Sequence, residues 1–208
     1  QAVSELRGFP KLEGTRHVNM ALIAKLVPTY MFMPAPFEEI GRITDDRNDD
    51  YLFHQGTTHG YAKTKFHDYH IAYNSLAHLP NVKVYMEQIE AYKEYLMVSG
   101  PNLAKQMRDF DYLLAVGELF TMVAYGQLII ESAKIEGISD EVMNQMFDMF
   151  VRDFTAFAVD LYGKPLNTDE QIEKIQKMIK RPVVNQAEFE KVLNEEVFSL
   201  VDVYIQNP

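Results

Sequence analysis

The sequence of 208 residues contains no cysteine. Disulfide bonds and thiolate metal sites are therefore excluded. The sequence also lacks low-complexity segments and internal repeats, and hydrophobic residues make up 47% of it, within the range of ordinary globular proteins. A chain of this length can bury a substantial core. The composition thus predicts a folded protein and argues against disorder.

The sequence has fewer basic than acidic residues. Lysine and arginine number 20 against 30 aspartates and glutamates, which gives a formal net charge of -10. Binding to the phosphates of nucleic acids requires clustered lysine and arginine, and the sequence shows no such stripe. We therefore expect no nucleic-acid partner.

Long uninterrupted hydrophobic runs are also lacking. The most apolar window, residues 112–130, approaches the length of a bilayer span, but Glu118 and Gln127 interrupt it. We interpret this window as a central helix buried by its neighbours. No signal peptide is recognisable, and the start at Gln1 indicates trimming or excision from something longer. We expect a soluble protein of the cytoplasm, or of an organelle matrix in a eukaryote, in which only a short segment such as residues 30–37 would contact a membrane.

Helical patterns and helix-stop signals run along nearly the whole chain, and no run with strand periodicity stands between turn signals. The predicted fold is all-α, a helical bundle. Pro28 and Pro80 are expected to end helices, whereas Ser139 and Thr168 are expected to begin them. A long acidic loop is predicted over residues 41–60. Helices are predicted over approximately residues 15–26, 63–78, 82–98, 102–136, 139–162, 168–180 and 186–204.

Four of the six histidines fall between His54 and His70. The spacing of His67 and His70 could place both on one helix face, and with His54 or His59 they could bind zinc. The His-Glu-x-x-His pattern is absent, so we favour histidines at the surface or core edge and predict no metal site. The aromatic residues around them suggest an aromatic interface patch: Tyr61, Phe66, Tyr69, Tyr73 and Tyr85.

Two further features lie in the long apolar helix. Glu118 and Glu131 could be functional carboxylates, or they could simply pair with Arg108 or Arg152. Gly117 and Gly126 lack side chains and are expected to let neighbouring helices approach closely.

The stretch "PKLEGTRHVN" near the N-terminus carries the clearest chemical signal. Thr15 is expected to begin a helix whose free N–H groups form an anion site suited to a pyrophosphate. Gly14 permits close approach of the backbone, and Glu13 would project just ahead of that site. A carboxylate beside a bound phosphate-bearing cofactor is a reasonable proton acceptor.

The longer stretch "KLEGTRHVNMALIAKLV" resembles the C-terminal "YEGT" segment of acyl-CoA dehydrogenases. In that family the glutamate removes the α-proton of an acyl thioester, carried by CoA or a carrier protein, and the β-carbon gives a hydride to FAD. The resemblance implies that Glu13 is the base and that Gly14, Thr15 and His17 contact FAD. It also implies a homo-oligomer whose flavin and acyl site is completed by the rest of a longer chain or by a companion chain.

Two positions depart from the family pattern. Leu12 stands where the family has an aromatic residue, and His17 stands where glutamine is common. The first change concerns the substrate or ring environment and the second concerns cofactor contact, but neither removes the base.

The resemblance also divides the chain. Residues 1–33 would end the helical C-terminal domain of the dehydrogenase, and residues 34–208 would form a helical extension. This extension is similar in layout to that of very-long-chain acyl-CoA dehydrogenases, where it aids dimerisation and membrane association. Two alternatives remain open. One is a non-catalytic helical interaction or dimerisation module in which "LEGT" is only a helix cap, and the other is a flavoenzyme of the same family with a different oxidation reaction.

Overall fold

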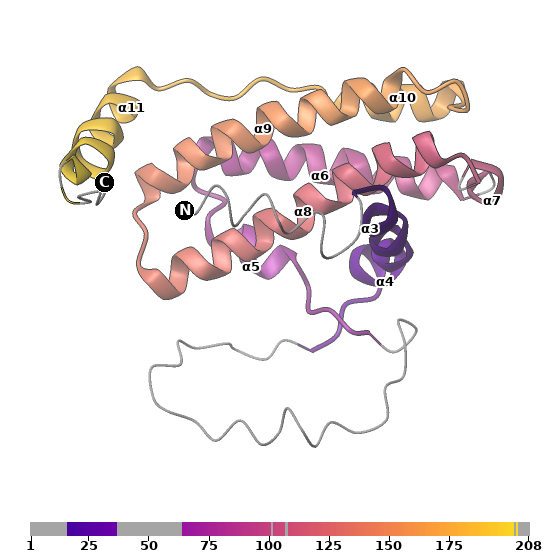
Figure 1. Ribbon diagram of the computed structural model, residues 1–208, viewed down its shortest axis with the longest axis horizontal. Coiled ribbons are helices and arrows are strands. Elements are labelled where there is room, and N and C mark those ends of the chain that lie inside the picture. Colours follow the sequence, from indigo (N-terminus) through magenta and orange to yellow (C-terminus); the bar gives the residue numbers. More distant parts are fainter. Residues whose placement is uncertain (1–15, 37–63, 101, 107, 202, 204–208) are drawn as a thin grey trace, which may run out of the picture.

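The computed structural model describes residues 16–36, 64–100, 102–106, 108–201 and 203 (Figure 1). Regular structure in these ranges is helical. They contain no strand, and one isolated parallel bridge joins Ala35 to His67. The predicted all-α class is therefore confirmed for the described part of the chain.

The described helices form a bundle built on α6, α8 and α9. Helices α6 and α8 both pack against α9, α10 packs against α6 and α9, and α3 lies against α8 (Figure 1). A 3₁₀ turn η1 (Ala24–Leu26) links α3 to α4, while a π-helical turn η4 (Leu193–Val197) and a 3₁₀ turn η5 (Phe198–Leu200) follow α11. The α-helices are α3 (Arg16–Ile23), α4 (Val27–Phe32), α5 (His70–Ser75), α6 (Pro80–Ser99), α7 (Leu103–Gln106), α8 (Phe110–Glu136), α9 (Asp140–Tyr162), α10 (Asp169–Met178) and α11 (Gln186–Val192).

Local capping fixes several helix ends where the sequence predicted them. The Ser139 hydroxyl accepts a hydrogen bond from the backbone N–H of Val142 at the start of α9. Thr168 and Gln171 form a capping box at the start of α10. Gly137, with φ 70°, ends α8 in the left-handed conformation that glycine adopts without steric cost.

The two prolines expected to end helices instead begin them. Pro80 is the first residue of α6, and Pro28 lies in the first turn of α4. The first turn of a helix tolerates proline because its N–H groups have no partner within the helix. The chain therefore remains almost continuously helical from Arg16 to Phe32, and the expected stop after residue 26 is wrong.

Three predicted helices are shorter than expected. Helix α5 covers only residues 70–75 of the predicted 63–78, because the Asp68 carboxylate turns the chain by accepting from the N–H of His70. The predicted helix 102–136 is divided into α7 and α8, because the Asp109 side chain caps α8 by accepting from the N–H groups of Asp111 and Tyr112. Regular α-helix in the segment 186–204 ends at Val192.

Tyrosines dominate the core and bind the central helix through their hydroxyls. Tyr73 of α5 donates to the carbonyl of Val123 at 2.6 Å, and Tyr92 of α6 donates to the carbonyl of Val116 at 2.9 Å. Both carbonyls belong to α8, so buried tyrosines combine apolar packing with polar anchoring. The predicted interface patch is therefore wrong for its described tyrosines: Tyr69, Tyr73 and Tyr85 are core residues.

Helix α8 is buried along one side only. It is the one helix in the described part that is long and apolar enough to cross a membrane, and 56% of its most apolar window is buried inside the protein. Val123 and Leu119 are fully buried, whereas Phe110, Tyr125 and Leu128 are exposed. The expectation that neighbours surround this helix is therefore met on the core side and wrong on the outer side.

Among the described residues, the segment from 179 to 200 is little buried. Residues 179–185, which we call the strap, run along α9 and connect α10 to α11 at the opposite end of the bundle (Figure 1). No residue of the C-terminal arm, residues 186–200, is buried. The arm nevertheless carries large apolar side chains, among them Phe189 and Phe198.

Candidate functional site

The predicted catalytic motif lies outside the described residues. Glu13, Gly14 and Thr15 precede the first described residue, and for His17 only its backbone within α3 is described. Helix α3 begins at Arg16, directly after Thr15 in the sequence. The roles of these four residues therefore stay predictions.

Helix α3, which follows the motif, rests on the central helix. Gly117 of α8 lies under Met20, and a Cβ atom built on Gly117 would meet Met20 at 3.5 Å. The Thr121 hydroxyl, one turn further along α8, donates to the Met20 sulfur at 3.6 Å. The lack of a side chain at Gly117 thus accompanies close packing of α3, as the sequence predicted.

A polar network joins α4, α8 and the segment before α5. His67 Nε2 lies 2.6 Å from both Glu131 Oε1 and Gln127 Nε2, and Gln127 Nε2 donates to Glu131 Oε1 at 2.8 Å. The Tyr30 hydroxyl donates to Gln127 Oε1. An imidazole beside a carboxylate can exchange a proton with it, so this network combines proton-accepting and proton-donating groups in a half-buried position.

Tyr30 acts in this network as a hydrogen-bond donor. Burial raises the pKa of its hydroxyl above the ordinary value, and the nearby Tyr69, Glu131 and Asp68 raise that pKa further. The hydroxyl therefore keeps its proton at physiological pH. Sequence analysis singled out His67 and Glu131 but missed Tyr30 and Gln127. Tyr30 and Gln127 lie 97 positions apart in the sequence, and no local pattern joins them.

A second polar cluster surrounds His70 at the start of α5. Its Nδ1 lies 2.5 Å from Asp68 Oδ1, and its Nε2 lies 3.1 Å from Glu90 Oε1 on α6. The His70 ring therefore links Asp68, which lies just before α5, to Glu90 of α6.

The Asp68 carboxylate is held in its charged form. Partial burial alone would raise its pKa, but hydrogen bonds from the backbone and ring of His70, with the charges of His70 and Lys93, lower that pKa below the ordinary value. A cavity of about 190 Å³ opens beside this cluster. Its lining combines aromatic and charged side chains: Tyr30, Met31, Phe32, Pro34, Asp68, Tyr69, His70 and Lys93.

His67 and His70 do not have the arrangement that the zinc hypothesis required. His67 precedes α5 and turns to α8, whereas His70 turns to Asp68 and α6, so the two do not share a helix face. His54 and His59 lie outside the described residues. Within the described ranges, no group of three or more histidine, aspartate or glutamate side chains could hold a metal ion.

The remaining candidate carboxylates have different surroundings. Glu131 binds His67 and Gln127, and Glu118 is half-buried on α8. Arg152 pairs instead with Asp148, one turn away on α9, with Nε 2.6 Å from Oδ1. The suggested pairing of Arg152 with a carboxylate of α8 is therefore wrong.

The chain was compared with known proteins at the levels of family, sequence and structure. No family model, no curated protein and no solved structure matches it. The acyl-CoA dehydrogenase resemblance accordingly rests on residues 11–27 alone.

Proposed function

We propose that this chain is the C-terminal portion of a flavin-dependent oxidoreductase similar to acyl-CoA dehydrogenases. The observation that carries the proposal is the sequence Leu12-Glu13-Gly14-Thr15, which immediately precedes a helix supported by the central helix of a bundle. A helix held in this way keeps its first N–H groups in a fixed position, which suits a phosphate-bearing cofactor.

In the proposed reaction, Glu13 removes the α-proton of an acyl thioester. The chemistry that bound FAD would supply is acceptance of the hydride from the β-carbon, which would leave an enoyl thioester. Gly14 would allow close approach of the cofactor, and Thr15 and His17 would contact it. Burial against the substrate would raise the pKa of Glu13 and make it a stronger base. The rest of a longer chain or a companion chain would complete the site in a homo-oligomeric enzyme of the cytoplasm or an organelle matrix.

The proposal is tested on the complete protein that contains this chain. Flavin bleaching after anaerobic addition of an acyl thioester reports proton and hydride removal together. Glu13→Gln keeps the shape of the side chain but cannot accept the proton. Loss of a general base slows a reaction on the order of a hundredfold or more, so bleaching should slow by that factor while flavin stays bound. Thr15→Ala should instead weaken flavin retention, measured from the flavin spectrum after gel filtration.

A matched control is Glu173→Gln, an exposed glutamate of α10. This variant should bleach at the wild-type rate. Normal bleaching by Glu13→Gln would end the claim that Glu13 is the base.

A second candidate function is a non-catalytic interaction module. The observation that favours it is the exposed C-terminal arm. None of its residues is buried, and its large apolar side chains Phe189, Phe198 and Leu200 are exposed. Apolar surfaces of this kind mark protein contacts in many soluble proteins. In this case Glu13→Gln would be silent, and Thr15→Ala would cost only about 1 kcal/mol of stability.

A further inference from the structure

The cavity beside the start of α5 combines opposite charges with apolar side chains. It has a volume of about 190 Å³, and Met31, Phe32 and Pro34, from α4 and the residues after it, contribute apolar groups to its wall. Asp68 contributes a carboxylate, and Lys93 of α6 contributes an ammonium group. Sites for drug-sized molecules have volumes of about 300–1,000 Å³. The cavity therefore suits a smaller molecule.

Lys93 is a half-buried cation without a fixed partner. Within the described ranges its ammonium group forms no ion pair and no hydrogen bond. Its charge contributes to the lowered pKa of Asp68, yet the two side chains do not pair directly. Moving a charge partly out of water without a partner costs free energy. An anionic group in the cavity would offset that cost.

Asp68 uses only one of its two carboxylate oxygens within the chain. Its Oδ1 accepts from the backbone N–H of His70 at 3.0 Å and lies 2.5 Å from the ring Nδ1 of the same residue. No residue in the described part of the chain donates to Oδ2. The His70 ring is already engaged at both nitrogens, because its Nε2 lies 3.1 Å from Glu90 Oε1. A cationic donor in the cavity would therefore bind Asp68 and not His70.

Two buried tyrosines also line the cavity. The rings of Tyr30 and Tyr69 are stacked with their centroids 5.4 Å apart, and the Tyr30 hydroxyl donates to Gln127. The Tyr69 hydroxyl is buried and has no hydrogen-bond partner among the described residues. Buried polar groups usually have such a partner. Tyr69 thus adds an unmet hydrogen-bonding group to the residues that line the cavity.

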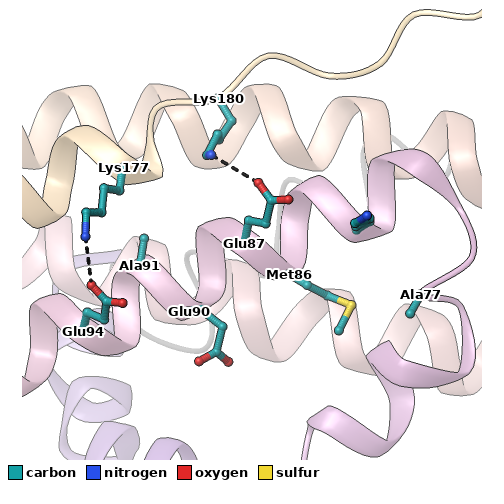
Figure 2. Close-up of a pocket in the computed structure, with 9 residues that line it drawn as sticks. Ala77, Met86, Glu87, Glu90, Ala91, Glu94, Lys177 and Lys180 are labelled. Carbon is teal, nitrogen blue, oxygen red and sulfur yellow. Dashed lines mark hydrogen bonds and ion pairs between the residues drawn. The ribbon is translucent and has the colours of Figure 1, made fainter.

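A larger cavity, of about 650 Å³, lies between α6 and the end of α10, and two lysines in its wall already have partners. Lys177 Nζ lies 3.4 Å from Glu94 Oε2, and Lys180 Nζ lies 3.2 Å from Glu87 Oε2 (Figure 2). These ion pairs join α10 and the strap to α6. The two lysines are therefore engaged within the chain, in contrast to Lys93.

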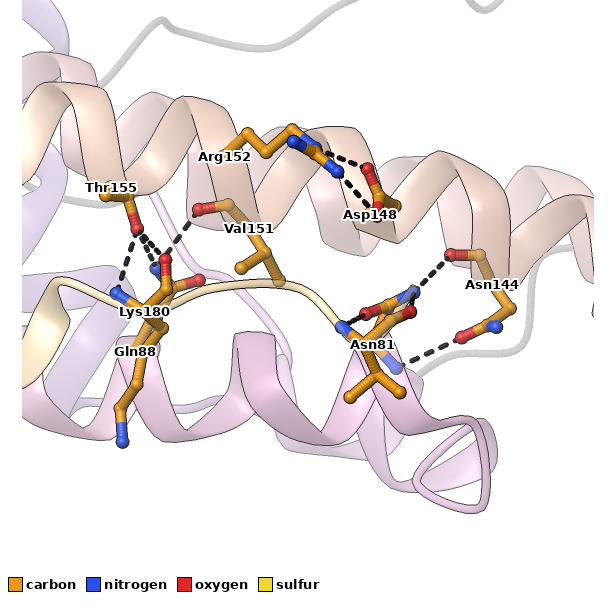
Figure 3. A network of polar contacts seen from close by, with 9 residues as sticks. Asn81, Gln88, Asn144, Asp148, Val151, Arg152, Thr155 and Lys180 are labelled. Carbon is orange, nitrogen blue, oxygen red and sulfur yellow. Dashed lines mark hydrogen bonds and ion pairs between the residues drawn. The ribbon is translucent and has the colours of Figure 1, made fainter. Parts of the chain in front are cut away.

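The strap engages polar side chains of α6 and α9 in the same way. The Asn81 side-chain amide accepts from the N–H of Val183 at 2.7 Å and donates to its carbonyl at 3.2 Å (Figure 3). The Thr155 hydroxyl accepts from the N–H of Lys180 at 3.0 Å and donates to its carbonyl at 2.8 Å (Figure 3). Asn81 and Thr155 therefore hold the strap against the bundle and do not need a ligand.

We propose that the cavity lined by Asp68 and Lys93 binds a small free α-amino acid with an aliphatic side chain, such as leucine. The ligand ammonium donates to Asp68 Oδ2, the Lys93 ammonium donates to the ligand carboxylate, and the aliphatic group contacts Met31 and Phe32. Because like charges repel, Asp68 disfavours a purely anionic ligand and Lys93 disfavours a simple amine. A zwitterion satisfies both side chains.

The probe is L-leucine, titrated into the full chain and followed by isothermal titration calorimetry. Leucine should bind saturably at one site. Lys93→Met keeps the length of the side chain but removes its charge, so it should weaken binding at least about tenfold through loss of a charged hydrogen bond. The matched control is Lys83→Met, which changes an exposed lysine of the same helix and should bind leucine like the wild type.

Ligand analogues test both charges without changing the protein. Leucinamide lacks the carboxylate and N-acetyl-leucine lacks the ammonium, so each should bind at least about tenfold more weakly than leucine. Leucinamide should also bind Lys93→Met no more weakly than the wild type, because the group that Lys93 contacts is missing. Absence of saturable leucine binding, equal leucine affinity of Lys93→Met and wild type, or equal affinity for leucine and leucinamide would overturn the proposal. Neither flavin nor thioester is added, so the outcome is independent of the proposed dehydrogenation.

Discussion

The bundle core and the C-terminal arm are both rich in large apolar residues, yet their environments are opposite. Phe154 on α9 is fully buried, with its ring centroid 5.5 Å from that of Tyr85. Phe198 in the arm is 54% exposed. The core residues meet side chains from α5, α6 and α8, whereas the arm is joined to α9 by polar contacts near its start. Lys191 pairs with Glu141 at 2.6 Å, and Glu188 accepts from the side-chain amides of α9 residues Asn144 and Gln145. Apolar composition alone therefore does not place a segment in the core.

Truncation of one phenylalanine in each region gives the sharpest contrast. Phe154→Ala should lower the free energy of unfolding by about 3–5 kcal/mol, because a large buried side chain is lost and a cavity remains. Phe198→Ala should change it by about 0.5 kcal/mol or less, as is usual for exposed positions. Urea unfolding of both variants, with unchanged m-values, measures the difference. Equal losses would show that the arm belongs to the cooperative core.

The close approach of helices at Gly126 gives the next largest effect. A Cβ atom there would lie 2.4 Å from the Tyr73 hydroxyl oxygen and 3.3 Å from Tyr85 Cε1. The Tyr73 hydroxyl is already bonded to the carbonyl of Val123, so it cannot move without losing that contact. Gly126→Ala should therefore destabilise the fold by about 1–3 kcal/mol through overpacking.

Gly117→Ala is the matched control on the same helix. Its Cβ atom would meet Met20 at 3.5 Å, an ordinary contact distance, and alanine is the better helix former. Stability should stay the same or rise. If thermal unfolding shows similar losses for Gly117→Ala and Gly126→Ala, then the tyrosine contact is not the reason for glycine at Gly126.

The smallest effect concerns pH and the Asp68–His70 pair at the edge of the core. The pKa of Asp68 is lower in the folded state, so the contribution of its charge to stability is present above the unfolded-state pKa of about 3.9 and is lost as pH falls through the folded-state value. The melting temperature of Asp68→Asn should lie below that of the wild type at pH 6, and the gap should narrow as the pH falls below the unfolded-state pKa and close once the folded-state carboxylate is protonated. A gap that stays constant over this range would contradict an electrostatic role. Both side chains are partly exposed, so solvent screening keeps the effect small.

The candidate sites contain some residues that are close together in the sequence and others that are far apart, and only the first kind could be found from the sequence. The Glu13-Gly14-Thr15 motif was found because its residues are adjacent in the sequence, and the spacing of the histidines drew attention to His67 and His70. Asp68 is adjacent to His70 in the sequence, but the distant partners of these histidines could not be predicted. Glu131 lies 64 positions from His67, and Glu90 lies 20 positions from His70.

The hydrogen bonds that hold the strap against α6 and α9 left no signal in the sequence. Asn81 and Val183 are 102 positions apart, and a lone asparagine at the start of a helix resembles many others. The predicted helix 186–204 is helical as far as Leu200, but regular α-helix ends at Val192 and gives way to the π-helical turn η4 and the 3₁₀ turn η5. Its pattern is amphipathic, but no residue of the arm is fully buried, and helix stability in proteins depends mainly on packing of the apolar face.

The sequence by itself determined the all-α class and the helix ends at Gly137, Ser139 and Thr168, because capping depends on hydrogen bonds and backbone conformations within about four residues. Only the tertiary structure decided which side of α8 is buried and that the proline at Pro80 begins a helix. It also decided that Asn81 and Thr155 bind the strap. These outcomes depend on contacts between segments far apart in the chain, and the free energy of such contacts exists only after the helices have packed together.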